Sequence, residues 1–327
     1  MASAEQLKAL FKSHLKGDDA HFFAVAMQVA AHEARLGHGK LAQELRVLID
    51  EAKAGQQTSQ FTKKPVPIAR PRGDLSTLLA VSYPKIRLAD MILSEDLSDR
   101  LTRIIKEQRQ LARLRSHGLS PRRKLLLIGP PGTGKTMSAS ALAGEFGLPL
   151  FEIRLEGLIT KYMGETAAKL RLVFDAIAET RGVYLFDEFD SIGSHRGERN
   201  DVGEIRRVLN SFLQFIEQDE SDSLILAATN HPEILDYALY RRFDDVIPYT
   251  LPDNTLIIKT LKSRLTTYVK NTLAWNKLAE FASGLNYAEI TRACNEAIKE
   301  NIIYERKLLS TDDLMRSLSE RKSIVQK

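Results

Sequence analysis

The stretch that decides the fold of this 327-residue chain reads Gly129-Pro130-Pro131-Gly132-Thr133-Gly134-Lys135-Thr136. It matches the pattern GxxxxGK(S/T), follows an apolar run at residues 124–128 and opens an alanine-rich helical pattern. Glycines let backbone N–H groups surround phosphate oxygens, and the N-terminus of the helix adds positive potential. We therefore predict an ATP site formed by these residues and Met137, with Lys135 on the β and γ phosphates and Thr136 on Mg²⁺.

Two acids end a second apolar run, in which residues 183–186 are followed by Asp187 and Glu188. A strand that ends there places Asp187 beside the metal ion and Glu188 beyond it, where an attacking water lies. One carboxylate then holds Mg²⁺ while the other orients or deprotonates the water. A solvated turn after any strand often produces such a pair, so the assignment depends on the phosphate loop upstream.

Two polar features follow a third apolar run, residues 224–228. Asn230 can hydrogen-bond the γ-phosphate and the water, or it is an ordinary asparagine in the turn before Pro232. Arg241 and Arg242 close a short helical segment and can complement its negative end. Alternatively they reach the γ-phosphate of a neighbouring subunit as arginine fingers, which accelerates hydrolysis by a factor of about 10³–10⁵.

The pattern of apolar residues divides the chain into four parts. Residues 1–55 predict a short all-α domain, and the proline-containing segment 56–73 predicts a linker. Over residues 74–252, short apolar runs alternate with helical stretches, which is typical of an α/β fold with a parallel sheet between two layers of helices. Residues 253–327 are helical to the end and predict a small lid.

The first 55 residues are expected to bind a partner or a substrate. Leu41, Leu45 and Leu48 fall on one face of the last helix predicted there. Four of the seven histidines of the chain also lie in this part, but their spacing matches no metal-ligand pattern.

The composition is that of an ordinary soluble protein, with 43% hydrophobic and 27% charged residues. No apolar run approaches the roughly 18 residues of a membrane-spanning helix, and the N-terminus lacks the pattern of a secretion signal. A single cysteine, Cys294, lies in an apolar helical pattern, which excludes an internal disulfide and favours packing over chemistry. We expect a cytoplasmic protein without membrane insertion.

Positive charge gathers in one segment, although the net charge is only +5. Between residues 100 and 124 stand one acid, Glu107, and nine bases: Arg100, Arg103, Lys106, Arg109, Arg113, Arg115, Arg122, Arg123 and Lys124. A solvated helix face or a subunit contact explains the cluster, and contact with a nucleic-acid backbone is the alternative.

The motifs, in their order and spacing, resemble the AAA family of AAA+ ATPases: GPPGTGKT, YLFDE, AATN and LDYALYRRFDDVIPYTLPD. The resemblance covers about residues 85–305. The arginine pair directly before Phe243 is similar to that of the spastin, katanin and ESCRT-disassembly (meiotic) group. The resemblance implies ATP hydrolysis with Mg²⁺ at sites shared between subunits, and therefore a ring, usually a hexamer, of identical chains.

Two further segments resemble functional parts of that family. Lys161, Tyr162 and Met163 resemble the pore loop, in which Tyr162 grips an extended polypeptide by apolar contact and shape. The alternative is a loop tyrosine that covers the core. The polar stretch 193–202 occupies the place of a second pore loop.

Residues 284–290, Gly-Leu-Asn-Tyr-Ala-Glu-Ile, resemble the turn beside the nucleotide in that family, which adds Gly284 to the expected nucleotide contacts. The turn has no arginine, so positive charge on the phosphates is expected from Lys135 and from the Arg241 and Arg242 of a neighbouring copy. At the domain entrance, residues 86–90 replace the Trp-x-Asp-(Ile/Val) of the family, so the contacts to adenine depart from the pattern there.

These features predict a hexameric ATP-hydrolysing motor that remodels, unfolds or translocates a protein substrate through a central pore. Residues 1–55 recruit the substrate or a partner, and the motor can serve a separate protease or effector because the chain has no protease motif. Two alternatives stay open. One is an ATPase associated with nucleic acid through residues 100–124, and the other is a nucleotide-gated scaffold that controls a partner without threading it.

Overall fold

The computed structural model describes residues 19–35, 38, 40–49, 71, 73–158, 163–190, 201–234, 237–269, 273–305 and 308–325. The chain divides into two compact units, Met1–Pro67 and Ile68–Lys327. Within the described ranges, no helix has both the length and the apolar character that crossing a membrane requires.

The first unit contains two described helical segments, α2 (Asp19–Arg35) and a second one at residues 40–49. In the second segment Ile49 is buried. Of the predicted face, Leu45 is half-buried, whereas Leu41 and Leu48 are exposed, at 46% and 61%. Successive residues of a helix lie about 100° apart around its axis, so the segment buries the stripe through Ile49 and leaves the two leucines outside.

The second unit is built on one sheet of six strands in the order β1-β3-β4-β5-β2-β6. The strands are β1 (Leu79–Ser82), β2 (Lys124–Ile128), β3 (Leu150–Ile153), β4 (Val183–Phe186), β5 (Leu224–Thr229) and β6 (Asp245–Pro248). Among these strands five run parallel, and β1 pairs antiparallel with β3. The apolar runs predicted the parallel strands but not β1, which lies at the edge of the sheet and buries only Leu79 of its four residues, so it has no continuous apolar run.

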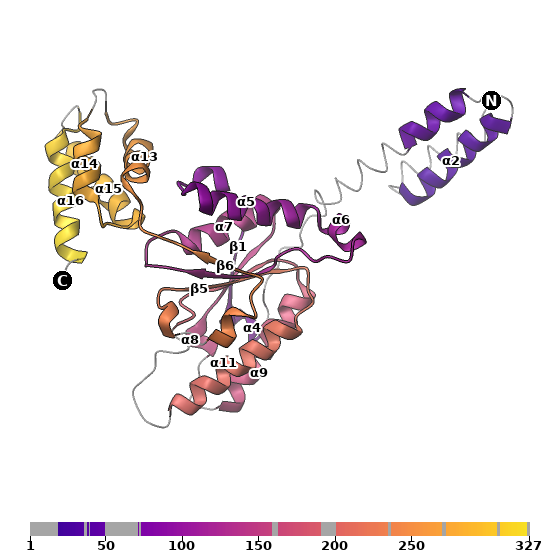
Figure 1. Ribbon diagram of the computed structural model, residues 1–327, viewed down its shortest axis with the longest axis horizontal. Coiled ribbons are helices and arrows are strands. Elements are labelled where there is room, and N and C mark those ends of the chain that lie inside the picture. The colour runs from indigo at the N-terminus through magenta and orange to yellow at the C-terminus, as the bar shows by residue number, and fades with distance from the viewer. Residues whose placement is uncertain are drawn as a thin grey trace. The chain divides into compact units, whose positions relative to one another are not determined.

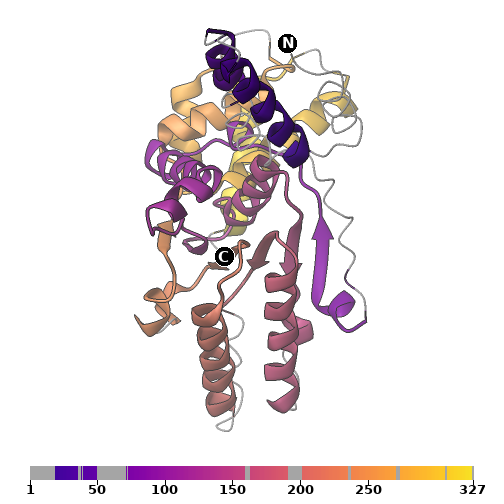
Figure 2. The same ribbon diagram turned by 90° about the vertical axis from the view of Figure 1, so that its right-hand side faces the viewer.

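Helices cover both faces of the sheet. On one face lie α5 (Glu95–Arg109) and α7 (Lys135–Phe146), and on the other lie α9 (Met163–Glu179) and α11 (Asp201–Gln218) (Figure 1). The last two helices run side by side (Figure 2). The predicted α/β architecture with two helical layers is confirmed.

The strands supply side chains to both layers. In β2, Leu126 packs in the core formed with α9 and α11, whereas Leu125 and Leu127 pack in the core formed with α5 and α7. All three side chains are fully buried. A strand covered on both faces therefore reads as a continuous apolar run and shows no polar alternation.

The C-terminal part is a bundle of four described helices, α13 (Asn254–Leu265), α14 (Trp275–Ala282), α15 (Tyr287–Ile303) and α16 (Thr311–Val325). The four helices lie together as a group (Figure 1), and their buried apolar side chains form a separate core. Cys294 is fully buried in it, and burial raises the pKa of its thiol to about 12, so this cysteine packs and does not react.

Shorter helical segments connect the main elements. They are α4 (Leu75–Leu78), η1 (Leu88–Asp90), α6 (Leu111–Ser116), α8 (Leu155–Leu158), η2 (Pro232–Ile234) and α12 (Tyr237–Tyr240).

Most bases of the basic segment are paired inside the molecule with acids from distant parts of the chain. Arg122 contacts Glu107 at 3.1 Å and Asp245 at 2.7 Å, and Arg123 pairs with the buried carboxylate of Asp219. Three further pairs follow the same plan: Arg100–Asp245, Arg109–Glu145 and Arg115–Asp222. The cluster therefore ties α5, α6 and β2 to their neighbours, which favours a structural role over a contact with nucleic acid.

Removing one aromatic ring from the core between the sheet and helices α9 and α11 tests how α11 packs. Phe212 is fully buried, and its ring centroid lies 4.6 to 5.8 Å from those of Phe174, Phe186 and Phe189. Phe212→Ala is expected to lower the free energy of unfolding by about 3–5 kcal/mol, because the cavity adds to the lost burial. Leu172→Ala, at a 38% exposed site, is the control and should cost about 1 kcal/mol or less. Chemical denaturation measures both, and equal small losses would contradict this packing.

Candidate nucleotide-binding site

The phosphate loop connects β2 to α7 and has positive φ at three glycines. Gly129, Gly132 and Gly134 adopt φ values of 145°, 73° and 102°, a region that residues with a Cβ rarely enter. Space excludes a side chain as well, because a Cβ on Gly129 would lie 2.1 Å from the carbonyl oxygen of Tyr249. The loop can therefore bring its backbone N–H groups directly against a phosphate.

Lys135 is the cation at the centre of the site and is only 7% exposed. Its ammonium donates to the carbonyl oxygens of Gly129 (2.7 Å) and Pro130 (2.9 Å) and to Oδ1 of Asn230 (2.8 Å). Burial lowers the pKa of this lysine, and the nearby carboxylate of Asp187 opposes the shift. The ammonium is thus held at the mouth of the loop, in reach of the end of β5.

Thr136 and Asp187 form a pair of oxygen ligands. The Thr136 hydroxyl donates to Oδ2 of Asp187 at 2.6 Å. Among the described residues, no group of three or more His, Cys, Asp or Glu side chains can hold a metal ion alone. Mg²⁺ prefers oxygen ligands and commonly completes its shell with phosphate oxygens and waters, so this donor set fits Mg²⁺ that binds together with a nucleotide.

Glu188 follows in an unusual backbone conformation, with a φ of 48°. For a residue other than glycine this costs roughly 1–3 kcal/mol and is found mainly at functional sites. Its N–H donates to Oδ1 of Asp187 at 2.9 Å. Asp187 thus faces Thr136, and both Asp187 and Glu188 line the same pocket.

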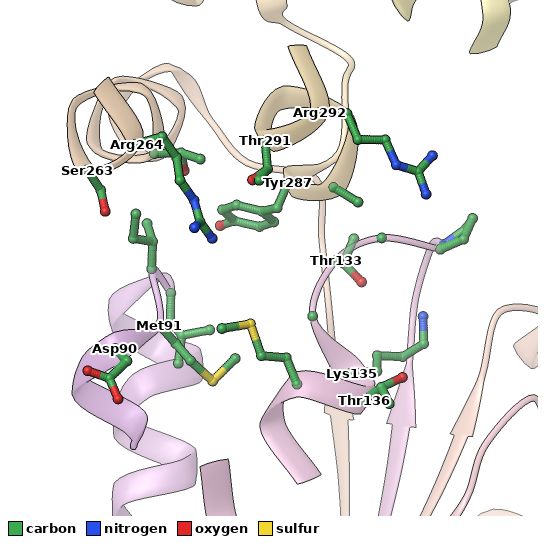
Figure 3. A pocket seen from close by; sticks show the side chains of 18 of the residues that line it. Asp90, Met91, Thr133, Lys135, Thr136, Ser263, Arg264, Tyr287, Thr291 and Arg292 are labelled. Carbon is green, nitrogen blue, oxygen red and sulfur yellow. The ribbon is translucent and has the colours of Figure 1, made fainter. Parts of the chain in front are cut away.

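A single pocket of about 660 Å³ joins these parts (Figure 3). The phosphate loop forms one wall, and residues 90–93, α13 and α15 form the others. Met91 and Tyr287 line the end away from Lys135 (Figure 3). The pocket therefore has a charged end at the phosphate loop. Its other end is mainly apolar and aromatic and lies beside the C-terminal helical bundle (α13–α16), which forms the lid.

The lid touches the phosphate loop directly. The N–H of Ala288 donates to the carbonyl oxygen of Gly132 at 3.3 Å. Asn286 caps α15 by accepting the N–H of Glu289 at 2.8 Å, and a Cβ on Gly132 would fall 2.6 Å from the Asn286 amide carbon. Any displacement of the loop must therefore displace the N-terminus of α15 or break this contact.

Most residues predicted to bind nucleotide meet in this pocket. The lining includes Pro131, Gly132, Thr133, Gly134, Lys135, Thr136, Met137, Asp187, Glu188 and Asn230. Gly129 and Pro130 hold Lys135 through their carbonyl oxygens. Gly284 does not line the pocket, although its φ of 88° turns the chain toward α15.

The predicted arginine fingers and pore loop lie apart from this pocket or outside the described chain. Arg241 and Arg242 are exposed just after α12 and do not line the pocket. Lys161 and Tyr162 lie outside the described residues, and Met163 is the first residue of α9.

Two arginines of the lid, which were not predicted as site residues, also line the pocket. Arg264 comes from α13 and Arg292 from α15 (Figure 3). Arg292 is paired with Glu289 at 2.8 Å. The sequence could have indicated Arg292, because it follows Ala288, which contacts the phosphate loop, by four positions and so lies on the same face of α15.

The parallel sheet, phosphate loop and helical lid define a P-loop ATPase. Residues 125–251 match the family described as "ATPase family associated with various cellular activities (AAA)". A relative described as "Uncharacterized AAA family ATPase y4kL", from Sinorhizobium fredii, is 36% identical over 98% of this chain and 96% of its own length. The chain belongs to the AAA family of ATP-hydrolysing enzymes.

Other relatives are similar over the ATPase part. The ATP-dependent zinc metalloprotease FtsH of Helicobacter felis is 32% identical over 69% of this chain and 37% of its own length. The proteasome-activating nucleotidase of Methanoculleus marisnigri is 34% identical over 62% of this chain and 51% of its own. This chain thus spans about a third to a half of these two proteins. The crystal structure of the FIGL-1 AAA domain has the same fold, with a TM-score of 0.61 and 23% identity over 78% of this chain and 91% of that domain.

A methyl group in the loop tests its geometry. Gly129→Ala is expected to weaken nucleotide binding by about 100-fold or more, because several kcal/mol are lost when a Cβ meets the Tyr249 carbonyl. Gly118→Ala is the control, since Gly118 also has a positive φ, 71°, but no atom within 4 Å of the added Cβ. Titration with a fluorescent ATP analogue measures both affinities. Nearly normal binding by Gly129→Ala would contradict the described loop.

Proposed function

We propose that this ATPase is a protein-remodelling motor, which uses ATP hydrolysis to pull on or unfold a polypeptide. One observation carries the proposal. A single chain supplies almost all of the nucleotide pocket, but Arg241 and Arg242, the arginine pair typical of a site shared between subunits, lie exposed away from it. Two relatives add support, because the names of both refer to proteolysis: a metalloprotease that depends on ATP and a nucleotidase that activates the proteasome.

The charged end of the pocket would take the triphosphate. Loop N–H groups and Lys135 bind the β and γ phosphates, and Thr136 and Asp187 hold Mg²⁺, which when bound offsets phosphate charge. Glu188 orients the attacking water and removes its proton. Asn230, already bonded to Lys135, holds the water and the γ-phosphate in line.

The other end of the pocket would take the base. Met91 and Tyr287 present an apolar and aromatic surface of the kind that stacks on a flat ring. Arg264 stands beside them on the lid side (Figure 3). In this arrangement residues 90–93 take over the task of the entrance motif that the chain lacks.

A second copy of the chain would complete the site. Arg241 and Arg242 follow the short helix α12 on the surface, and Arg242 forms an ion pair with Glu217 at 3.1 Å. A contact in which each copy donates to the next is heterologous, and such contacts close into rings when the rotation between copies permits. We propose a ring of six copies, the usual number in the family to which this chain belongs.

Tyr162 and the first unit would act on the substrate. In a ring, the Tyr162 side chains line the central channel and grip an extended chain without regard to its sequence. Leu41 and Leu48, which are exposed in the first unit, offer an apolar surface for recruitment. The free energy of unfolding of a typical domain is about 5–15 kcal/mol, which repeated hydrolysis can supply.

Mixing two inactive variants tests the shared site. Glu188→Gln is expected to bind ATP and assemble but to hydrolyse it about 100-fold more slowly, because the water loses its base. Arg241→Ala should be similarly slow alone. Mixed rings should regain part of the wild-type ATPase rate, because each variant supplies the half that the other lacks.

The control for this mixing experiment is Arg46→Ala, at an exposed arginine of the first unit, which should keep its ATPase rate. Co-assembly of the two variants is checked by native mass spectrometry. Mixed assemblies without any regained activity would rule out arginines that act between subunits.

Tyr162→Ala tests the pore loop. It should keep the basal ATPase rate but process an unfolded test protein about tenfold more slowly or worse, since each aromatic grip on the chain is lost. Tyr162→Phe is the matched control and should process the protein normally. The same assays with DNA at low and moderate salt separate the alternatives. Stimulation by DNA that disappears with salt and ignores Tyr162→Ala would favour a nucleic-acid ATPase instead.

A further inference from the structure

Asp190 is a buried carboxylate beside the pocket that does not line it. It lies three positions after Asp187 in the turn that follows β4, and it is 9% exposed. A buried carboxylate has lost most of its hydration, so it is stable only where protein donors replace water. The donors around Asp190 therefore show which part of the chain it holds.

The donors come from the end of β5. Oδ1 of Asp190 accepts the hydroxyl of Thr229 at 2.9 Å and the backbone N–H of Asn230 at 3.2 Å. Thr229 is fully buried, and its Oγ1 accepts the N–H of His231 at 3.0 Å. Three consecutive residues at the end of β5 are thus anchored by one carboxylate and one hydroxyl.

These bonds continue the pairing of β4 and β5 past the point where the strands end. The strand register runs to Phe186 opposite Ala227, and beyond it the N–H of Phe189 donates to the carbonyl oxygen of Ala228 at 2.8 Å. Asp190 adds two bonds to the same junction. The turn that carries the acidic pair and the turn that carries Asn230 are therefore one connected piece.

Asn230 carries the connection into the pocket. Its Oδ1 accepts the ammonium of Lys135 at 2.8 Å. The negative charge of Asp190 also favours the charged form of Lys135 by raising its pKa, against the opposite effect of burial. Contacts thus run from Asp190 through Asn230 to the lysine expected at the γ-phosphate.

We propose that Asp190 is a positioning residue for ATP hydrolysis, which fixes the Asn230 amide toward Lys135 and locks it to the turn that carries Glu188. The inference rests on the role proposed for Asn230 in hydrolysis and not on the protein substrate of the motor. Without the bond to its backbone N–H, the amide spends less time in place. Turnover then falls, while ATP, which is bound mainly by the phosphate loop, is retained.

A double-mutant cycle on the basal ATPase of the full chain, without protein substrate, tests the proposal. Asn230→Ala is expected to lower kcat about 30-fold and Asp190→Ala about tenfold, with KM for ATP changed less than about threefold. In the Asn230→Ala background, Asp190→Ala should cost less than about twofold, because the amide that it positions is gone. Three results would each overturn the proposal. The first is a double variant whose loss of kcat equals the product of the two single losses, and the others are a normal kcat for Asp190→Ala or for Asn230→Ala.

Four further variants separate positioning from stability. Asp190→Asn keeps an oxygen for both donors and should return kcat to within about threefold of wild type. Thr229→Val removes one donor with little change of shape but keeps the bond from the Asn230 N–H, so it should lower kcat less than Asp190→Ala does. Asp190→Leu, which has nearly the shape of aspartate but no acceptor, replaces Asp190→Ala in the cycle if that variant does not fold. Asp219, which precedes β5, is a buried carboxylate that pairs with Arg123. Asp219→Ala should lower the free energy of unfolding, but its effect on kcat should be the same with and without Asn230→Ala. A failure of the protein-motor proposal leaves these basal rates, and so this test, unaffected.

Discussion

The carboxyl ends of three adjacent parallel strands meet at one edge of the sheet, and the whole site depends on this arrangement. β5 lies between β4 and β2, and the register sets Ile128 opposite Thr229 and Phe186 opposite Ala227. The loop that follows β2, the acidic turn that follows β4 and the polar end of β5 are therefore neighbours. Strands so placed are covered on both faces, and their continuous apolar character follows from that burial.

The phosphate loop is enclosed from two sides, which connects nucleotide binding to the rest of the molecule. Tyr249 lies against Gly129 on one side, and the N-terminus of α15 contacts Gly132 on the other. Both contacts need glycine, the first because a Cβ would strike a carbonyl and the second because it would strike Asn286. A lid that rests on the loop can respond to what the loop binds, and such a response is what the proposed motor needs to convert hydrolysis into movement.

Several features of the site were predictable because they depend on short spacing along the chain. The glycine pattern, the acidic pair after an apolar run and the polar end of the next run each occupy a few consecutive residues, and the structure brings them together. Charge pairing was not predictable in this way. The basic segment has one acid within its own sequence, Glu107, yet Asp219 and Asp245 approach it from distant positions. Arg264 and Arg292 were likewise missed as pocket residues, because their place depends on how the lid packs.

The sequence by itself determined the fold class, the phosphate loop and the identity of the acids and amide that surround it, since backbone conformation and apolar period are local properties. Only the tertiary structure decided which side chains share a pocket, which bases are paired and which leucines of the first unit are exposed. It also revealed Asp190, whose partners lie 39 and 40 positions away. The physical reason is that hydrogen bonds, ion pairs and burial are set by distance in space, which packing of the two layers and the lid creates and which no spacing along the chain records.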